Sequence, residues 1–156
     1  MIIERAKEQD IEKIIELLGQ ILELHASIRP DLFRMGTTKY TEEELLEMIR
    51  DDARPIYVAR DEEYTVTGYA FCVLKEVPFS NTMVPHRTLF IDDLCVDQKR
   101  RGEGIGRRLF VFLTKEAKNL GCSDVTLNVW EGNENARRFY EKLGMKPRET
   151  MMELKI

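Results

Sequence analysis

The chain passes from a strand-like run into an amphipathic segment through Val96-Asp97-Gln98-Lys99-Arg100-Arg101-Gly102-Glu103-Gly104-Ile105-Gly106-Arg107-Arg108-Leu109. Apolar residues before this stretch are typical of a strand at 88–96. Those after it recur at helical spacing, at Ile105, Leu109, Phe112, Leu113, Ala117 and Leu120. Glycines at the start of a helix leave its first backbone N–H groups open to an anion, which the helix dipole also favours. The stretch therefore predicts a phosphate-binding turn.

Positive side chains crowd this turn, although the whole chain has a formal net charge of -4. They are Lys99, Arg100, Arg101, Arg107 and Arg108. Such a local reversal of charge favours a polyanionic ligand. An ordinary glycine turn with a solvated basic face is the alternative interpretation.

Two well-known phosphate-binding loops do not fit the spacing. A P-loop ends in Gly-Lys-Ser/Thr, whereas Gly106 is followed by Arg107. A dinucleotide-binding turn reads G-x-G-x-x-G, usually in the first strand-helix unit, and an acid closes its next strand. Here the spacing is G-x-G-x-G, the loop lies late in the chain, and Asp124 opens the next strand. What remains is the pattern Arg101-x-x-Gly104-x-Gly106.

Length and composition predict one domain over residues 1–156, because 43% hydrophobic content is enough for a real core. No apolar run approaches a membrane span and charges interrupt the N-terminus early, so we expect a cytoplasmic protein without a membrane partner. Cys72, Cys95 and Cys122 are far apart and lack C-x-x-C spacing, which indicates neither disulfides nor a metal site. The acidic balance argues against nucleic acid.

The patterning predicts a series of elements along the chain. They are a strand at 1–5, a helix at 8–25, a loop or short helix at 27–39 near a possible acceptor, a helix opened by the capping box Thr41-x-x-Glu44, a hairpin of 56–60 and 65–77, a polar stretch at 78–86, a strand at 88–96, a long helix, a strand at 124–130, a helix from Asn133 to Gly144 and a strand at 146–156. A right-handed crossover makes the strands at 88–96 and 124–130 parallel neighbours. The helix starts at Gly104 and Asn133 then share the sheet edge where α/β proteins bind ligands.

A second motif lies at Asn133-Glu134-Asn135-Ala136-Arg137-Arg138-Phe139-Tyr140-Glu141-Lys142-Leu143-Gly144-Met145. With the glycine turn, it resembles the two hallmarks of the GNAT superfamily of acyl-CoA N-acyltransferases, the second of which reads N-x-x-A-x-x-F/L-Y-x-x-L-G-F. Met145 replaces the usual phenylalanine. The resemblance covers residues 88–147 closely and the first half only by pattern.

The resemblance implies an α/β (α+β) fold of the GNAT type. Its mixed central sheet would have about six to seven strands flanked by about four helices. The parallel fourth and fifth strands would splay apart around acetyl-CoA. The first half of the chain holds acceptor specificity in this family.

The resemblance also implies direct transfer of an acetyl group from acetyl-CoA, the co-substrate, to a primary amine of a small molecule or peptide. Backbone amides would hold the pyrophosphate in the loop formed by Arg101, Gly102, Glu103, Gly104, Ile105, Gly106 and Arg107. The main chain of Leu94, Cys95 and Val96 would pair with the pantetheine like an added strand and polarise the thioester carbonyl. Asn133, with Asn135 second, would bind the pantetheine or cap its helix.

Tyr140 matches the tyrosine of the family that protonates the departing CoA thiolate. The alternative is a core aromatic on the apolar face of its helix. A phenol with an ordinary pKa of about 10 stays protonated at neutral pH, as a general acid must.

The base is predicted on the strand at 88–96. Some family members have a glutamate on the fifth strand for this role, but the matching residue here is Asn128, which cannot take a proton. Period-two alternation places Asp92 on the face of Leu94, and Asp93 on the opposite face. Asp92 also matches the acid of some aminoglycoside acetyltransferases of the superfamily, so it is the first choice. A carboxylate paired with an arginine or capping a loop is the alternative.

Other functions remain open at this point. The chain could be a non-catalytic module that senses acetyl-CoA or a nucleotide, although sensing would not need Tyr140. Cys95 as an acyl-carrying nucleophile is disfavoured because no base is near it in the sequence. The acidic residues between 42 and 52 favour a cationic amine acceptor, or are only a solvated helix face. A homodimer is compatible with all of these hypotheses.

Overall fold

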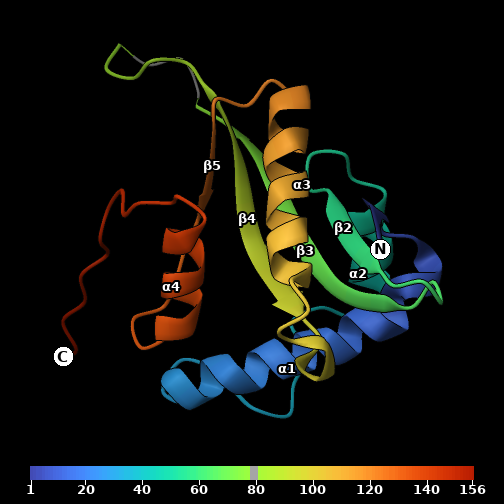
Figure 1. Ribbon diagram of the computed structural model, residues 1–156. Coiled ribbons are helices and arrows are strands. Elements are labelled where there is room, and N and C mark those ends of the chain that lie inside the picture. Colours follow the sequence, from blue (N-terminus) through green and yellow to red (C-terminus); the bar gives the residue numbers. More distant parts are fainter. Residues whose placement is uncertain (78–80) are drawn as a thin grey trace.

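The computed structural model describes residues 1–77 and 81–156. In these residues the strands form one open sheet in the order β1-β2-β3-β4-β5 (Figure 1). Their bounds are Ile2–Arg5 for β1, Ile56–Arg60 for β2, Val66–Glu76 for β3, Arg87–Val96 for β4 and Asp124–Leu127 for β5. The first four pair antiparallel, and β4 pairs parallel with β5. The mixed sheet and the parallel pair are as the sequence predicted.

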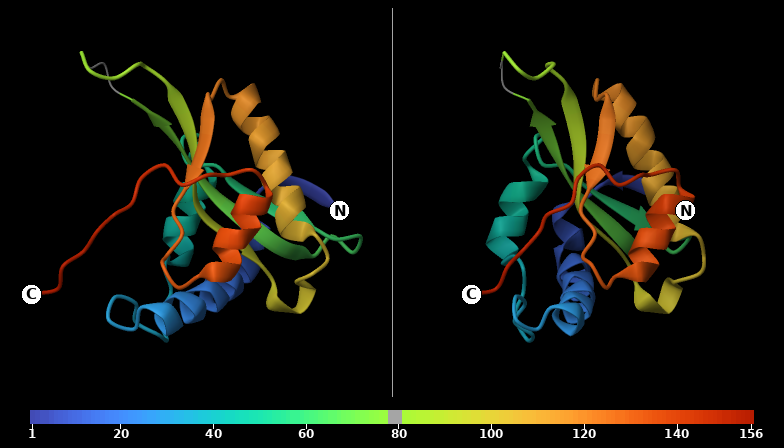
Figure 2. Two further views of the ribbon diagram at one scale, coloured as in Figure 1. Left: turned by 60° about the vertical axis from the view of Figure 1, so that its left-hand side comes forward. Right: turned by 90° about the vertical axis from the view of Figure 1, so that its left-hand side faces the viewer.

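Helices cover both faces of the sheet (Figure 2). Their bounds are Ile11–Ile28 for α1, Glu42–Ile49 for α2, Ile105–Asn119 for α3 and Glu134–Lys142 for α4, with 3-10 turns η1 at Glu8–Asp10 and η2 at Gln98–Arg100. The predicted capping box opens α2, because Thr41 and Glu44 each accept a hydrogen bond from the other's backbone N–H. None of the helices in residues 1–77 and 81–156 is long and apolar enough to cross a membrane.

Two apolar layers sandwich the sheet. Side chains of α1 and α2 pack with Tyr69, Phe71 and Cys95 on one face. Side chains of α3 and α4 pack with Leu89 and Ile91 on the other. The alternation of β3 and β4 thus has a buried partner on each side, which is why both strands read as continuous apolar runs.

The parallel contact between β4 and β5 is short. It runs from Thr88 beside Asp124 to Ile91 beside Leu127, whereas β4 continues to Val96. The expected strand at 124–130 therefore ends three residues early, since residues 128–130 have left β4. The main-chain edge of β4 beyond Ile91 has no strand of the described chain on the β5 side.

A β-bulge in β4 changes which residues share a face. Phe71 of β3 pairs with Asp93, but its neighbour Cys72 pairs with Ile91, so Asp92 is the extra residue. The simple alternation that set Asp92 and Asp93 on opposite faces is wrong for this strand. Both carboxylates lie on the α1 and α2 face, as their contacts below demonstrate.

The expected strand at 146–156 is not formed, and the sheet has five strands, not the six to seven expected. Met151, Met152 and Leu154 are 96%, 84% and 87% exposed, and the C-terminus projects away from the body (Figure 1). A strand exists only where a neighbouring edge accepts its backbone hydrogen bonds, and this tail leaves its own sheet. The expected polar stretch at 78–86 lies partly outside the described residues.

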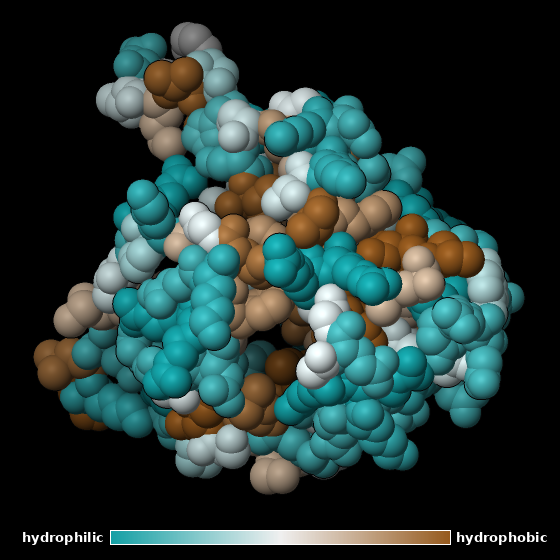
Figure 3. Space-filling view, in the orientation of Figure 1, coloured by the Kyte–Doolittle hydropathy of each residue, from teal (hydrophilic) through white to brown (hydrophobic). Residues whose placement is uncertain are grey.

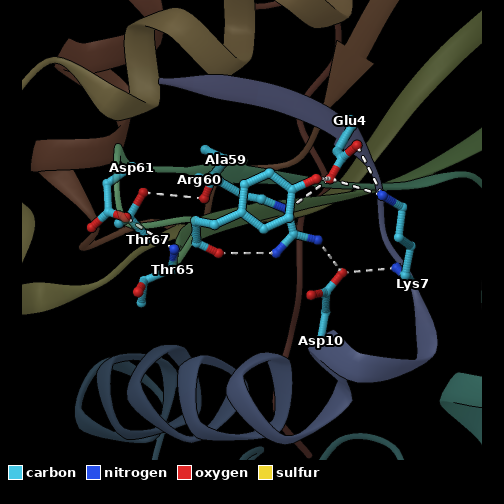
Figure 4. Close-up of polar contacts among 9 residues, drawn as sticks. Glu4, Lys7, Asp10, Ala59, Arg60, Asp61, Thr65 and Thr67 are labelled. Carbon is cyan, nitrogen blue, oxygen red and sulfur yellow. Dashed lines mark hydrogen bonds and ion pairs between the residues drawn. The ribbon is translucent and has the colours of Figure 1, made fainter.

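A buried arginine fixes the entry to α1. Arg60 of β2 is 2% exposed and donates to Glu4 at 2.7 Å and to Asp10 at 2.7 Å, while the ring of Tyr64 lies over its guanidinium (Figure 4). Asp10 also accepts from the backbone N–H of Lys7 at 2.8 Å. The network joins β1, η1 and the β2–β3 hairpin, so the turn of that hairpin is held in place beside the glycine loop.

Candidate active site

The glycine turn opens α3 with its backbone unobstructed. Gly104 is the N-cap at φ +77°, a left-handed conformation, and no side chain caps the first N–H groups of the helix. Apart from the adjacent residues and the local helix backbone, no atom of the described chain lies within 4 Å of the position a Cβ would take at Gly104 or at Gly102. A glycine is needed at 104 for the backbone conformation, and the space around it leaves room for a ligand at the helix start.

The residues before the turn are tied to other elements. Asp97, 6% exposed, accepts from the backbone N–H of Lys99 at 3.0 Å and pairs with Lys13 of α1 at 2.8 Å. Arg100 donates to Asp61 in the β2–β3 turn at 2.8 Å. The loop is therefore held by both α1 and the hairpin, and does not depend on a ligand for its course.

Of the five positive side chains around the turn, one forms ion pairs within the protein and four do not pair with the described residues. Arg100 is held between Asp61 and Glu103, at 2.8 Å from each. The other four form no ion pair with the described residues, and are Lys99, Arg101, Arg107 and Arg108. Two of them, Arg107 and Arg108, line an open depression along α3 together with Lys115. Positive charge thus surrounds the free N–H groups.

Gly106 has a different role from the other two glycines. A Cβ there would lie 3.2 Å from Cζ of Phe139 on α4 and 3.6 Å from Cγ2 of Val96. The missing side chain lets α3 pack closely against α4 and the end of β4. The third glycine of the motif therefore holds together the two segments that carry the sequence resemblance.

The unpaired edge of β4 faces this junction. Leu94 and Val96 are partly buried beside Ile105 and Leu109 of α3. Figure 3 shows a hollow between α4 and the glycine loop, above α1, with apolar side chains around it. Residues 94–96 of β4 pair with β3 on one edge. Their other edge, at this opening, has no strand beside it in the described chain.

Cys95 belongs to the core. It is 3% exposed, its Sγ lies 3.6 Å from the carbonyl oxygen of Leu17, and burial raises its thiol pKa to about 12. A protonated, buried thiol is a poor nucleophile. The burial of the thiol disfavours Cys95 as a nucleophile, and the main-chain role expected for it stays a prediction.

Helix α4 begins at its asparagine. The side chain of Asn133 accepts from the backbone N–H of Ala136 at 3.2 Å, so its capping role is realised. Asn135 is the second residue of α4 and is exposed. The capping interaction uses only the oxygen of Asn133, which leaves its amide nitrogen for a further partner.

Tyr140 lies on the sheet side of α4. Its ring centroid is 5.0 Å from that of Phe139 and 6.1 Å from that of Phe110. Burial, and then the charge of Asp93, raise the pKa of its phenol above the ordinary value. Among the described residues its hydroxyl has no hydrogen-bond partner. Tyr140 therefore packs as a core aromatic and also keeps a protonated hydroxyl that can donate a hydrogen bond.

The bulge in β4 places two carboxylates side by side. Asp92 pairs with Lys39 at 2.9 Å, and its side chain is 34% exposed. Asp93 is 8% exposed and accepts from the hydroxyl of Tyr69 at 3.1 Å. Burial raises the pKa of Asp93 to about 6, against the opposing charge of Lys39.

Lys39, the partner of Asp92, is a site residue that the sequence did not predict. Burial opposes its charge, but the ion pair with Asp92 and the nearby charge of Asp93 raise its pKa. Its Nζ also lies 5.4 Å from the ring centroid of Tyr40. Nothing in the local sequence singles out this lysine, because its partner is 53 residues away.

Aromatic side chains extend the site from the carboxylates toward the end of α1. Phe33 contacts His25 at 5.2 Å and Trp130 at 5.4 Å between ring centroids. Burial, with the charge of Lys39, lowers the pKa of His25. The expected loop at 27–39 thus lies beside the carboxylates, and α1 extends into it as far as Ile28.

The structure brings most of the expected site residues together. Gly106 of the loop lies beside Val96 at the edge of β4 and beside Phe139 of α4, and Asp93 is near enough to Tyr140 for its charge to raise the pKa of the phenol. Asn133 lies at the start of the same helix α4. Asn128 is exposed and lies just beyond β5. In residues 1–77 and 81–156 there is no cluster of three or more His, Cys, Asp or Glu side chains suited to a metal ion.

Comparison with known proteins points to one family. The family model described as Acetyltransferase (GNAT) family matches residues 18–145. Thialysine N-epsilon-acetyltransferase of Bos taurus is 25% identical over 154 residues, covering 92% of this chain and 83% of that protein. Glucosamine 6-phosphate N-acetyltransferase of Trypanosoma brucei brucei is 38% identical over 64 residues, covering 41% of this chain and 42% of that protein.

The fold comparison reaches the whole chain. A solved mutant of the BH1408 protein from Bacillus halodurans is 33% identical, with a TM-score of 0.95 and coverage of 100% of this chain and 99% of that one.

Proposed function

Because the chain belongs to the acetyltransferase (GNAT) family, we propose that residues 1–156 form one N-acetyltransferase domain that moves the acetyl group of acetyl-CoA directly to a primary amine. The acceptor is a small molecule or a peptide. The observation that carries this proposal is the meeting of three features at one opening of the sheet. These are the unpaired edge of β4, the open glycine turn and the hydroxyl of Tyr140.

The residues present suit acetyl-CoA. Backbone N–H groups of residues 102–107 would hold its pyrophosphate, with Arg101 and the other unpaired cations supplying positive charge. Leu94, Cys95 and Val96 would pair through their main chain with the amide groups of the pantetheine, as an added strand does. Asn133 would bind through its free amide nitrogen, and Asn135 second.

Tyr140 is proposed as the general acid. As the amine nitrogen forms its bond to the acetyl carbon, the carbon–sulfur bond breaks and the leaving sulfur takes the proton of the phenol. A raised pKa keeps that proton in place at neutral pH. A main-chain N–H of β4 would donate to the carbonyl oxygen of the thioester and stabilise the negative charge that forms there as the amine attacks.

Asp92 is proposed as the proton acceptor. Of the two carboxylates on the bulge it is the one that an incoming amine can reach, since Asp93 is buried beneath it. The ammonium of Lys39 already occupies Asp92 at 2.9 Å, so the ammonium of the acceptor would replace it there. Asp93 adds negative charge behind the pair, which favours a cationic acceptor.

Within this proposal the charges of the site favour a cationic amine, carried by a small molecule or a peptide. The relatives matched here are N-acetyltransferases of thialysine and of glucosamine 6-phosphate. The aromatic group around Phe33, with Arg29 over Trp130 at 5.9 Å, offers contacts beyond the amine itself. A cytoplasmic location and a reaction without a metal complete the proposal.

Two measurements test it. Calorimetric titration with acetyl-CoA, CoA and ATP should detect binding of the first two, and ATP binding without CoA binding would refute the proposal. Release of CoA thiol should then be followed over thialysine, lysine, glucosamine 6-phosphate, polyamines, aminoglycosides and peptide N-termini. Tight acetyl-CoA binding with no turnover of any amine would indicate a sensing module instead.

A further inference from the structure

Lys39 reaches the two carboxylates of the β4 bulge from an anchored stretch of the segment between α1 and α2. Its neighbour Tyr40 stacks on Phe71 of β3, with 5.6 Å between the ring centroids and 21° between the ring planes. The next residue, Thr41, is the cap of α2. The chain directly after Lys39 is therefore fixed to the sheet and to a helix, so the fold itself sets the position of this lysine.

The amine of Lys39 lies where the proposed function puts the amine of the acceptor. Its Nζ is 2.9 Å from a carboxylate oxygen of Asp92, the proposed proton acceptor. The side chain of Lys39 is 40% exposed, so the amine is neither sealed in the core nor free in solvent. A lysine ends in a primary amine, which is the group that the proposed reaction acetylates.

The groups proposed for the acyl-donor side lie around the same bulge. The charge of Lys39 acts on Asp93, and the charge of Asp93 acts in turn on the phenol of Tyr140. One buried carboxylate is thus within electrostatic range of both the amine and the proposed acid. Residues 94–96, whose main chain would hold the thioester, follow directly in β4. Amine, proton acceptor, acid and thioester position are therefore grouped together.

We propose that Lys39 is a self-acetylation site, at which the protein transfers the acetyl group of acetyl-CoA to its own Nζ and thereby clears Asp92 for an external amine. The inference rests on the proposed function, because it uses the same acyl donor, acid and proton acceptor. It adds a substrate that belongs to the chain itself.

The chemistry of this step balances with the groups already assigned. The ammonium of Lys39 gives one proton to Asp92, and the free amine attacks the acetyl carbon. The carbon–nitrogen bond forms, the carbon–sulfur bond breaks, and the leaving sulfur takes the proton of Tyr140. The second proton of the nitrogen restores the phenol, and the first passes from Asp92 to solvent. The products are Nε-acetylated Lys39, CoA thiol and one proton.

Acetylation would change what Asp92 meets at the site. An acetylated lysine is neutral, so the ammonium that now pairs with Asp92 would be gone. Its amide N–H can still donate to the carboxylate, but a neutral donor binds a carboxylate more weakly than a charged one. A cationic acceptor would then displace an amide in place of an ammonium. The KM for that acceptor should fall after the first self-transfer.

Peptide mass spectrometry of the full chain, before and after incubation with acetyl-CoA alone, tests the proposal. Lys39 should carry one acetyl group, with an equal release of CoA thiol, at a rate independent of protein concentration. Two lysines are controls within the same molecule. Lys13 also pairs with an aspartate, Asp97, at 2.8 Å, but away from the bulge, and should stay unmodified. Lys75 is exposed on β3 and reports acetylation that the fold does not assist.

Two variants separate self-transfer from chemical acetylation. Tyr140→Phe should slow the acetylation of Lys39 by roughly 10²-fold or more, while the background at Lys75 stays the same. Lys39→Arg keeps a cation for Asp92 but offers no amine to acetylate, so it should release no CoA thiol from acetyl-CoA alone. Incubation with acetyl-CoA should lower the KM of the wild type for a cationic amine severalfold, and should leave the KM of Lys39→Arg unchanged.

The same samples distinguish failure of this inference from failure of the proposed function. A protein that acetylates an external amine while its Lys39 stays unmodified would overturn self-acetylation and leave the proposed function intact. A protein that binds no acetyl-CoA would overturn both. Acetylation of Lys39 no faster than that of Lys75 would be unassisted chemistry and would also overturn the inference. So would a rate that rises with protein concentration, because the amine would then come from another copy.

Discussion

At the scale of single residues, Tyr140 combines two properties that are usually alternatives. It packs against Phe139 and Phe110, and it keeps a protonated hydroxyl near Asp93. Packing needs only the ring, whereas proton donation needs the hydroxyl. A phenylalanine separates the two because it preserves the ring alone.

We therefore expect Tyr140→Phe to lower kcat by roughly 10²- to 10⁴-fold, the usual contribution of a general acid. Affinity for acetyl-CoA and the unfolding midpoint should stay close to those of the wild type. Single-turnover kinetics with calorimetric titration of the same samples measures both quantities. A variant within a factor of two of the wild-type rate would leave Tyr140 as a packing residue.

The acidic pair on β4 gives the second residue-scale prediction. Asp92→Asn should retain the acetyl-CoA site and lower kcat/KM, because the amide has the shape of the carboxylate but no proton affinity. The rate of the wild type should rise with pH on an acidic limb that this variant lacks. Identical limbs in both proteins would exclude Asp92 and favour solvent or His25 as the acceptor.

Lys39→Met is the control for this interpretation. It removes the ammonium that competes for Asp92 and leaves the carboxylate in place. The acidic limb should persist in this variant, and the KM for the amine should fall. Loss of the limb in Lys39→Met would mean that the lysine, and not Asp92, titrates.

At the scale of elements, the strand, turn and helix that form the glycine loop were predictable from residues 88–120 alone. Their signals are local, since glycine spacing and apolar periodicity both act within a few residues. The hairpin and the capping box of α2 were found for the same reason. The bulge at Asp92 and the ion pair with Lys39 were not, because both depend on a partner strand or loop far away in sequence.

The glycines of the loop should respond differently to substitution. Gly104→Asp places a carboxylate in open space at the helix start but in a left-handed backbone, which costs an aspartate some stability. We therefore expect a folded protein of slightly lower stability that has lost acetyl-CoA affinity through charge repulsion. Gly106→Asp should also lose stability, because its Cβ would lie 3.2 Å from Phe139. Titration with acetyl-CoA and urea unfolding of both variants distinguish the two effects. Full cofactor affinity in Gly104→Asp would refute the loop assignment.

At the scale of the whole molecule, the number of strands in the sheet could not be obtained from the patterns of the separate segments. The segment at 146–156 has strand character in its sequence, yet it forms no strand in the protomer. Strand formation depends on an available edge, which is a property of the assembled sheet and not of the segment.

The stability of the whole molecule should record the buried carboxylate of the site. Burial raises the pKa of Asp93 from the ordinary value of 3.8 to about 6. Between these values the folded state holds a proton that the unfolded state has released, so the contribution of Asp93 to stability falls as pH rises. A shift of this size corresponds to a loss on the order of 3 kcal/mol above about pH 6.

Asp93→Asn should remove this loss, because the amide stays neutral and can still accept from Tyr69. We expect the variant to be more stable than the wild type at about pH 8 by roughly 2 kcal/mol, and the difference to vanish near about pH 4. Urea unfolding of both proteins across this range measures it. The comparison isolates Asp93 from carboxylates such as Glu4, whose pKa is lowered to about 2 by Arg60 and which act in the opposite direction in both proteins. A difference that is constant with pH would mean that Asp93 is ionised in the fold at no cost, and that the site holds its negative charge without strain on the rest of the molecule.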